Sequence, residues 1–159
     1  MKLTELVAEH NIILVSGNLC SGKGYYCATQ YPEYYHLPVS DVVKRLAKTN
    51  VRSQLANTES MDKLIVEELC KYIDAHPNIV IDGIRQVSII KALQYRYGDN
   101  IKDIIWLDVP DDTRRQRFAN RADKKDDVSF DDASAGDTKL GIGDVEKYMR
   151  YFGRTVNNN

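Results

Sequence analysis

The strongest constraint on the fold of this chain is a glycine-rich octet that directly follows a short apolar run. Residues 12–16 read IILVS and residues 17–24 read GNLCSGKG, which fits the pattern GxxxxGK. The apolar run predicts a buried strand, and the residues after the octet predict a helix over 23–30. Glycines let backbone N–H groups curl around an anion, while Lys23 and the positive end of the helix add charge. Strand, loop and helix together predict a phosphate-binding loop.

Apolar runs alternate with helical periodicity along the rest of the chain. We expect further strands at residues 34–37, 79–81, 104–109 and 155–156. We expect helices from residue 40, from residue 60, across 87–97, from 110 to about 121, and across 144–151. This alternation predicts an α/β fold in a single domain over 1–159, with a parallel sheet of about five strands and helices on both faces. The polar segment 123–137 predicts a mobile loop.

Composition limits the setting in which the protein works. The chain has 159 residues, a formal net charge of −1 and three cysteines that lack CxxC spacing. These values favour a reduced compartment, and they argue against a protein held on nucleic acid by its overall charge, although a local basic patch would suffice. The first residues form no signal-peptide pattern and no apolar run is long enough to cross a membrane. We therefore expect a cytoplasmic protein, in the host cytoplasm if the source is viral.

With four further segments, the loop resembles the nucleoside-monophosphate-kinase group of P-loop proteins, which includes adenylate, thymidylate and dephospho-CoA kinases. Residues 81–85, IDGIR, are similar to the group's Asp-Gly-x-x-Arg segment but one residue shorter. Arg114, Arg117 and Arg121 lie in an RxxRxxxR array similar to that of the group's lid. Segments 126–130 and 140–142 and the closing 156–157 are similar to small dephospho-CoA-kinase-like members. The resemblance implies a three-layer P-loop kinase fold with a short lid over about 123–137, and ATP and Mg²⁺ as cofactors.

The resemblance also assigns roles to individual residues. Asp82 would hold Mg²⁺ through a water, and Arg85 would contact the acceptor or the γ-phosphate. Arg117 and Arg121, one helical turn apart, can face the same phosphates. The residues expected to bind ATP are Gly17, Asn18, Leu19, Cys20, Ser21, Gly22, Lys23, Gly24 and Tyr25. The residues expected to take part in catalysis are Lys23, Asp41, Arg85, Arg117 and Arg121.

The acceptor is less constrained by the sequence. Asp41 can be read as a helix N-terminal charge or as a base that takes a proton from a substrate hydroxyl. The basic side chains of the segment 40–60 either line an anionic substrate or solvate a helix; these are Lys44, Arg45, Lys48 and Arg52. The residues assigned to acceptor binding are Asp41, Arg45, Arg52 and Arg85.

Three functions fit these features. The preferred acceptor is a hydroxyl on a larger nucleotide, such as 5-hydroxymethyluracil in DNA, which small phage enzymes resembling thymidylate kinases phosphorylate; the compact acceptor region and Asp41 suit it. The alternative acceptor is a free (deoxy)nucleoside monophosphate. The third function is a catalytically inactive ATP-binding adaptor, because Gly24 and Tyr25 stand where related loops place the Ser or Thr that binds Mg²⁺.

Overall fold

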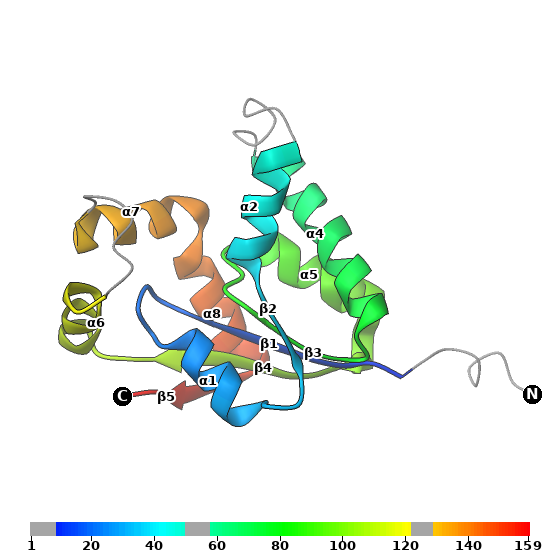
Figure 1. Cartoon of the computed structure of the whole chain (residues 1–159), viewed down its shortest axis with the longest axis horizontal. Helices are drawn as coiled ribbons and strands as arrows, with labels where there is room; N and C mark the ends of the chain where they lie inside the picture. Colours follow the sequence, from blue (N-terminus) through cyan, green and yellow to red (C-terminus); the bar gives the residue numbers. More distant parts are fainter. Residues whose placement is uncertain (1–8, 50–57, 122–128) are drawn as a thin grey trace, which may run out of the picture.

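The computed structural model describes residues 9–49, 58–121 and 129–159. Within these ranges five strands form one sheet in the order β2-β3-β1-β4-β5 (Figure 1). The strands are β1 (Asn11–Gly17), β2 (Tyr35–Pro38), β3 (Asn78–Asp82), β4 (Ile101–Asp108) and β5 (Arg154–Asn157). All four pairings are parallel, so the carboxyl ends of the strands share one edge of the sheet. The predicted parallel sheet of about five strands is confirmed.

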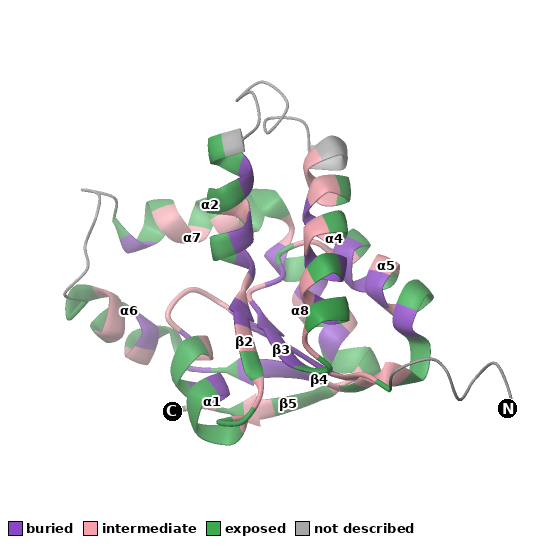
Figure 2. Ribbon diagram, turned by 45° about the vertical axis from the view of Figure 1, so that its right-hand side comes forward, coloured by how far each residue is buried: buried purple, intermediate pink, exposed green. Residues whose placement is uncertain are grey.

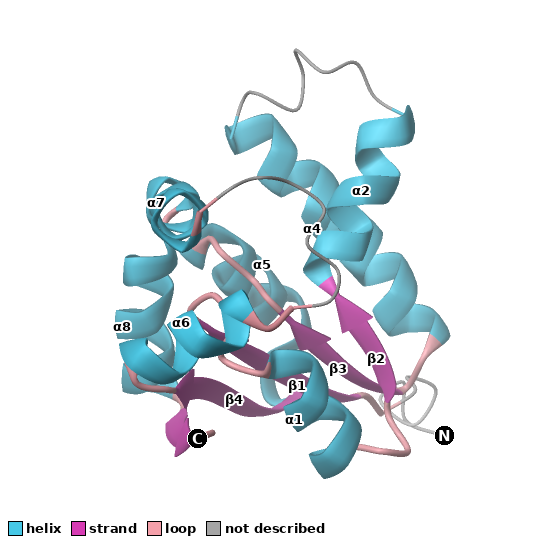
Figure 3. Ribbon diagram, turned by 60° about the vertical axis from the view of Figure 1, so that its left-hand side comes forward, coloured by secondary structure: helices cyan, strands magenta, loops and turns pink. Residues whose placement is uncertain are grey.

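Helices cover both faces of this sheet, as expected. Side chains alternate sides along each strand, and both sides carry apolar residues that pack against helices. Ile13 and Val15 pack with α1 (Lys23–Gln30) on one face, whereas Ile12 and Leu14 pack into the larger core on the other. The helices of that larger core are α2 (Val39–Thr49), α4 (Thr58–Ala75), α5 (Val87–Tyr97) and α8 (Ile142–Phe152). Figure 2 shows the buried centre of the sheet in purple, and Figure 3 shows α1 and α5 on opposite sides of it.

Two more helices, α6 (Asp111–Ala119) and α7 (Phe130–Leu140), lie beyond the carboxyl ends of β1 and β4 (Figure 1). The prediction of a loop over 123–137 is wrong for its second half, which is helical. Ser129 caps α7 by accepting a hydrogen bond from the backbone N–H of Asp132, and Gly141 ends the helix at φ 109°. The polar composition of α7 concealed these capping signals. Residues 122–128 of the same segment lie outside the described ranges.

Most other predicted elements differ only at their ends. The helix after the loop spans the predicted residues, while α2 begins at Val39 and α4 at Thr58, one and two residues before the expected starts. A short 3₁₀ helix, η2 (Gly98–Asn100), connects α5 to β4. None of the helices in the described ranges is long and apolar enough to cross a bilayer.

Candidate functional site

The loop between β1 and α1 has the backbone of a tightly wound anion-binding turn. Gly22 has φ 81° and Cys20 has φ 63°, both in the left-handed region. A Cβ on Gly17 would lie 2.4 Å from Ser21 Oγ and 3.0 Å from the carbonyl oxygen of Leu107. Position 22 therefore needs glycine for its backbone angle, and position 17 needs glycine because a side chain has no space there.

Two arginines of α6 hold the loop from behind through its carbonyl groups. Arg114 Nη1 donates to Leu19 O at 3.2 Å, and Arg117 Nη1 donates to Cys20 O at 3.2 Å. Arg114 is buried and is also paired with Asp111 at 2.8 Å. A trans peptide points its N–H away from its C=O, so carbonyl groups engaged from outside leave amide groups on the inner side of the loop. Arg114 and Arg117 therefore position the loop in this structure.

Asn158, just after β5, completes this clamp. Its Nδ2 donates to Ser21 O at 2.8 Å and to Gly22 O at 3.3 Å. The backbone carbonyl oxygen of Asn158 accepts a hydrogen bond from Arg117 Nη2 at 2.8 Å. The sequence analysis missed Asn158. The rule that residues following each parallel strand face the site would have found it if applied to the last strand.

The third arginine of the array lies apart from the other two. Arg121 is exposed just after α6, and its guanidinium lies 5.7 Å from the centre of the Phe118 ring. The expected contacts of Arg117 and Arg121 with phosphate groups stay predictions. The structure brings Arg117 to the loop backbone and leaves Arg121 at the end of the helix.

Lys23, Asp82 and Arg85 come together where the loop meets the end of β3. Burial lowers the pKa of the Lys23 ammonium; the charge of Asp82 opposes this shift, and that of Arg85 adds to it. A Cβ on Gly83 would lie 3.8 Å from Lys23 Cε, which places the lysine stem against this turn. The turn is tied to β1 by a hydrogen bond from the Gly83 N–H to Val15 O at 2.9 Å. Three residues that the sequence assigned to one site therefore share it.

Asp82 is 6% exposed and forms a hydrogen bond with His36 Nε2. That hydrogen bond is the main cause that raises the pKa of His36. Cys27 lies nearby on α1; burial, and secondarily the Asp82 carboxylate, raises the pKa of its thiol to about 12. His36 and Cys27 were not predicted as site residues. The available signal was strand register, since His36 pairs with Val80 and so shares the sheet face of Asp82.

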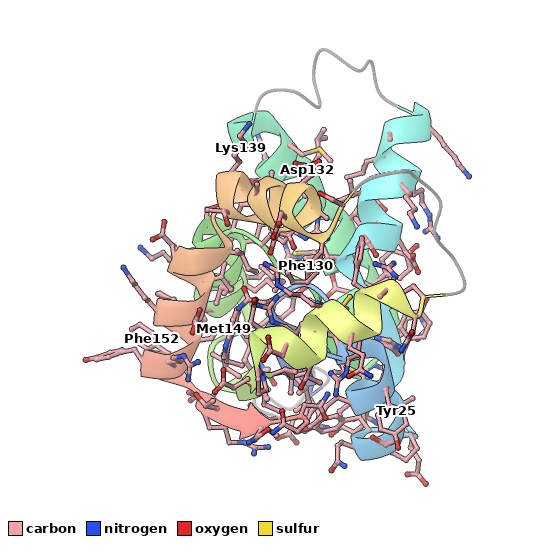
Figure 4. All side chains as sticks on the ribbon, turned by 90° about the vertical axis from the view of Figure 1, so that its left-hand side faces the viewer. Tyr25, Phe130, Asp132, Lys139, Met149 and Phe152 are labelled. Carbon is pink, nitrogen blue, oxygen red and sulfur yellow. The ribbon has the colours of Figure 1, made fainter. Side chains whose placement is uncertain are left out.

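Asp82 fits the role of a Mg²⁺ residue, because a carboxylate beside a phosphate loop supplies the oxygen ligand that this cation prefers. The hydroxyl that related loops place after the lysine has no counterpart here. Gly24 has no side chain, and Tyr25 is 75% exposed on the outer side of α1 (Figure 4). Asp82, at the end of β3 beside the loop, is therefore a protein group that would hold the ion.

A cavity of about 490 Å³ lies between α2, α4, the turn after β3 and α7. Its apolar lining residues are Val39, Val43, Met61, Ile65 and Leu140, and its other lining residues are Ser40, Lys44, Gly83, Arg85 and Gln86. The turn after β3 borders both regions, since Gly83 lines the cavity and a Cβ built on it would lie 3.8 Å from Lys23 Cε on the loop side. The cavity and the phosphate loop are therefore neighbours.

α7 contributes one wall of the cavity and one partner of Arg85. Leu140 lines the cavity, and Asp137 Oδ1 lies 3.4 Å from Arg85 Nε. The other end of α7 is fixed against α6 by Phe130, which is buried 5.7 Å from the Phe118 ring and carries the Arg115 guanidinium 4.6 Å above its ring (Figure 4). The helical half of the predicted lid thus borders the cavity.

Of the predicted acceptor residues in the described ranges, Arg85 lines this cavity and Asp41 and Arg45 do not. Arg45 lies with its guanidinium 5.1 Å above the Tyr72 ring. Asp41 is exposed in the first turn of α2, and its charge contributes to raising the pKa of His36. Lys44, one of the basic residues of this segment, is among the lining residues. Arg52 lies outside the described ranges.

Comparison with known proteins identifies the fold. No family model matches the chain, and no curated protein matches its sequence. Shikimate kinase from Bacteroides thetaiotaomicron matches the structure with a TM-score of 0.62 at 13% identity, covering 92% of this chain and 86% of the other. TT1252 from Thermus thermophilus matches with a TM-score of 0.60 at 14% identity, covering 95% and 90%. The chain therefore has the P-loop kinase fold seen in shikimate kinase, and at these identities the likeness concerns the fold alone.

Proposed function

We propose that this protein is an ATP-dependent phosphotransferase that binds ATP on the phosphate loop and its acceptor in the neighbouring cavity. The observation that carries the proposal is the turn after β3. A Cβ on Gly83 would lie 3.8 Å from Lys23 Cε, and Gly83 also lines the cavity, so this turn lies between the lysine and the cavity. A terminal phosphoryl group held by Lys23 would therefore face an acceptor in the cavity, as in-line transfer requires.

The residues of the loop side would position and neutralise the phosphates. Inner amide groups of the loop and Lys23 would bind them, and Asp82 would hold Mg²⁺ through a water. Mg²⁺, when bound, supplies neutralisation of charge on the transferred group. Arg85 would contact that group or the acceptor, and Arg121 would add a guanidinium to the phosphates, while Arg117 holds the loop from behind.

For the acceptor we propose a hydroxyl on a nucleobase, such as a hydroxymethylated pyrimidine in DNA. The apolar side chains lining the cavity suit a planar base, and a volume of about 490 Å³ is in the range of small-ligand sites. A base in duplex DNA would have to be extruded to enter. Asp41 follows Ser40, a cavity residue, and would serve as the base that accepts the hydroxyl proton.

A free (deoxy)nucleoside monophosphate is the second candidate acceptor. Lys44 and Arg85 both line the cavity and would provide cationic partners for its phosphate. An ATP-binding adaptor without catalysis is the third candidate, favoured by the lack of a hydroxyl at Gly24 and by the exposure of Tyr25. ATP binding without turnover on any acceptor would distinguish the adaptor from both kinases.

The deciding experiment is transfer of label from γ-labelled ATP with Mg²⁺ to two acceptor sets. One set is free nucleoside monophosphates, and the other is duplex DNA with or without hydroxymethylated pyrimidines. Label on hydroxymethylated DNA alone supports the first candidate, and label on a monophosphate supports the second. Label on neither, with ATP bound, contradicts both kinase proposals.

The variant Asp41→Asn separates the two kinase mechanisms. Loss of a general base from a hydroxyl acceptor should lower kcat by about 10²–10⁴-fold, whereas an anionic phosphate acceptor needs no such base. Asp144→Asn is the matched control, because Asp144 is also an exposed first-turn carboxylate, on α8. Equal rates for Asp41→Asn and Asp144→Asn on hydroxymethylated DNA would remove Asp41 from the mechanism.

A further inference from the structure

Three metal-binding side chains meet beneath the phosphate loop, outside the acceptor cavity. Cys27, His36 and Asp82 each offer one ligand atom, and these atoms all lie within 4.8 Å of one another. Cys27 is fully buried, Asp82 is 6% exposed, and the His36 side chain is 30% exposed. Two of the three side chains are therefore shielded from water, and the group is reachable through His36.

The fold explains why these residues converge. β2 and β3 are parallel, and the register pairs His36 with Val80 and Pro38 with Asp82. Side chains alternate along a strand, so Val80 and Asp82 lie on one face, and His36 points to the same face as its partner. Cys27 packs with Val80 in the core under α1. The three side chains thus come from α1, β2 and β3 to a single place.

Within α1, Cys27 lies one helical turn after Lys23, so both side chains face the sheet from the same side of the helix. Cys27 therefore lies one helical turn farther from the phosphate loop than Lys23, which would hold the phosphates. The Lys23 ammonium lowers the affinity of this place for any cation, while the Asp82 carboxylate raises it.

The chemistry of the three ligands differs from what Mg²⁺ prefers. Mg²⁺ binds oxygen ligands, whereas a set of thiolate, imidazole and carboxylate suits a borderline metal ion such as Zn²⁺. Three protein ligands with one remaining position is the arrangement of zinc sites that also admit a water or another ligand. We propose that Cys27, His36 and Asp82 form a binding site for Zn²⁺ or a similar transition-metal ion. Binding displaces the Cys27 thiol proton to solvent and replaces the hydrogen bond between His36 and Asp82, so the proton on His36 Nε2 moves to Nδ1 or leaves to solvent. No electron is transferred.

A shared carboxylate gives this site a consequence for the proposed kinase activity. Asp82 belongs both to the zinc site and to the residues that would hold Mg²⁺, so the two ions compete for it. Zn²⁺ therefore weakens Mg·ATP-dependent transfer, a part of the inference that rests on the proposed function. The binding itself does not depend on any activity and can be measured without ATP.

Co²⁺, added alone to the full chain, is the probe for the site. A tetrahedral site with a thiolate ligand gives Co²⁺ both a thiolate charge-transfer band and intense visible bands. We expect both bands to saturate at one equivalent of Co²⁺ and to disappear on addition of Zn²⁺. Absence of the charge-transfer band in the folded wild-type chain overturns the proposal.

Variants assign the bands to residues. Cys27→Ala should remove the charge-transfer band, whereas Cys70→Ala should keep it; both replace a buried helical cysteine, on opposite sides of the sheet. Cys20→Ala, in the loop, should also keep the band, and loss of the band in Cys20→Ala would overturn the proposal.

His36→Gln should weaken Co²⁺ affinity by at least about tenfold, which corresponds to about 1.4 kcal/mol. His76→Gln is its control, and equal affinities in the two histidine variants contradict the site.

Circular dichroism and thermal unfolding of each variant exclude loss of fold as the cause of a lost band. If Cys27→Ala unfolds, His36→Gln decides the question, because His36 is partly exposed and lies outside the buried core. Zn²⁺ inhibition of label transfer that is relieved in His36→Gln supports the competition for Asp82. Inhibition that persists unchanged in His36→Gln overturns the competition and leaves the result with Co²⁺ intact.

Discussion

The two halves of the candidate site are built in opposite ways. On the loop side, carbonyl groups of the backbone are held by hydrogen bonds from two arginines and one asparagine. On the cavity side, the walls are mainly apolar side chains of α2, α4 and α7. The loop side fixes a backbone shape through hydrogen bonds to its carbonyl groups, while the cavity side defines a volume by its side chains. We infer that a change of acceptor requires few substitutions in the cavity and none in the loop.

The largest effect expected on the loop side comes from Lys23. Lys23→Ala removes the charge beside the transferred group and should lower kcat by about 10²–10³-fold, with the fold retained. Label transfer from ATP measures the rate, and circular dichroism measures the fold. Lys71→Ala is the control, because Lys71 is an exposed lysine of α4 paired with Glu68. Wild-type activity in Lys23→Ala would end the proposed mechanism.

The next largest effect is expected from a substitution that changes the cavity side alone. Met61→Glu places a carboxylate in the cavity and should lower kcat/KM for any nucleotide acceptor by about 10- to 100-fold through like-charge repulsion, with the KM for ATP unchanged. Steady-state kinetics with each substrate varied in turn measure both parameters. Lys63→Gln on the same helix controls for net charge, because it changes the charge by the same one unit and Lys63 is exposed outside this cavity. A raised KM for ATP in Met61→Glu would show that the two halves are not separable.

A smaller effect tests the clamp behind the loop. Asn158→Ala removes the hydrogen bonds to Ser21 O and Gly22 O and should weaken ATP binding by about tenfold, with the affinity for the acceptor unchanged. Titration calorimetry with a non-hydrolysable ATP analogue measures the affinity. Asn159→Ala, at the neighbouring exposed position, should bind like the wild type. Equal affinities of the two variants would contradict the clamp.

The smallest effect compares adjacent basic residues of α2. Lys44→Ala should raise the KM for the acceptor by about five- to tenfold, because Lys44 lines the cavity. Arg45→Ala should change it by less than about twofold, since the Arg45 guanidinium lies over Tyr72. Acceptor-dependent kinetics of both variants give the comparison. A larger effect for Arg45 than for Lys44 would place the acceptor elsewhere on α2.

The loop side was predictable from the sequence because its main parts are contiguous. An apolar strand, a glycine-rich turn and Lys23 at a helix start lie within about a dozen residues, and each has a local physical signature. Asp82 and Arg85 were placed beside the loop for the same reason, since Asp82 ends β3 and Arg85 lies in the turn that follows it. The alternation of strands and helices was enough to predict the parallel sheet.

The parts that sequence analysis missed depend on contacts between distant segments. Asn158 reaches the loop across 137 residues, and His36 meets Asp82 through the pairing of β2 with β3. The choice between Lys44 and Arg45 depends on how α2 is rotated against α4, which periodicity alone does not give. α7 was missed for a different reason, because its polar residues 130–137 resemble a loop although Ser129 caps them as a helix.

The contact between Asn158 and the loop also has a consequence for the order of events during synthesis. The ribosome releases residues 17–24 long before residue 158, so the nascent chain can pair β1, β3 and β4 while the loop still lacks its last hydrogen-bond partner. Under the proposed function, ATP would gain its full affinity only after β5 has been added to the edge of the sheet. A chain that stops before residue 158 should therefore bind nucleotide more weakly than one that contains it.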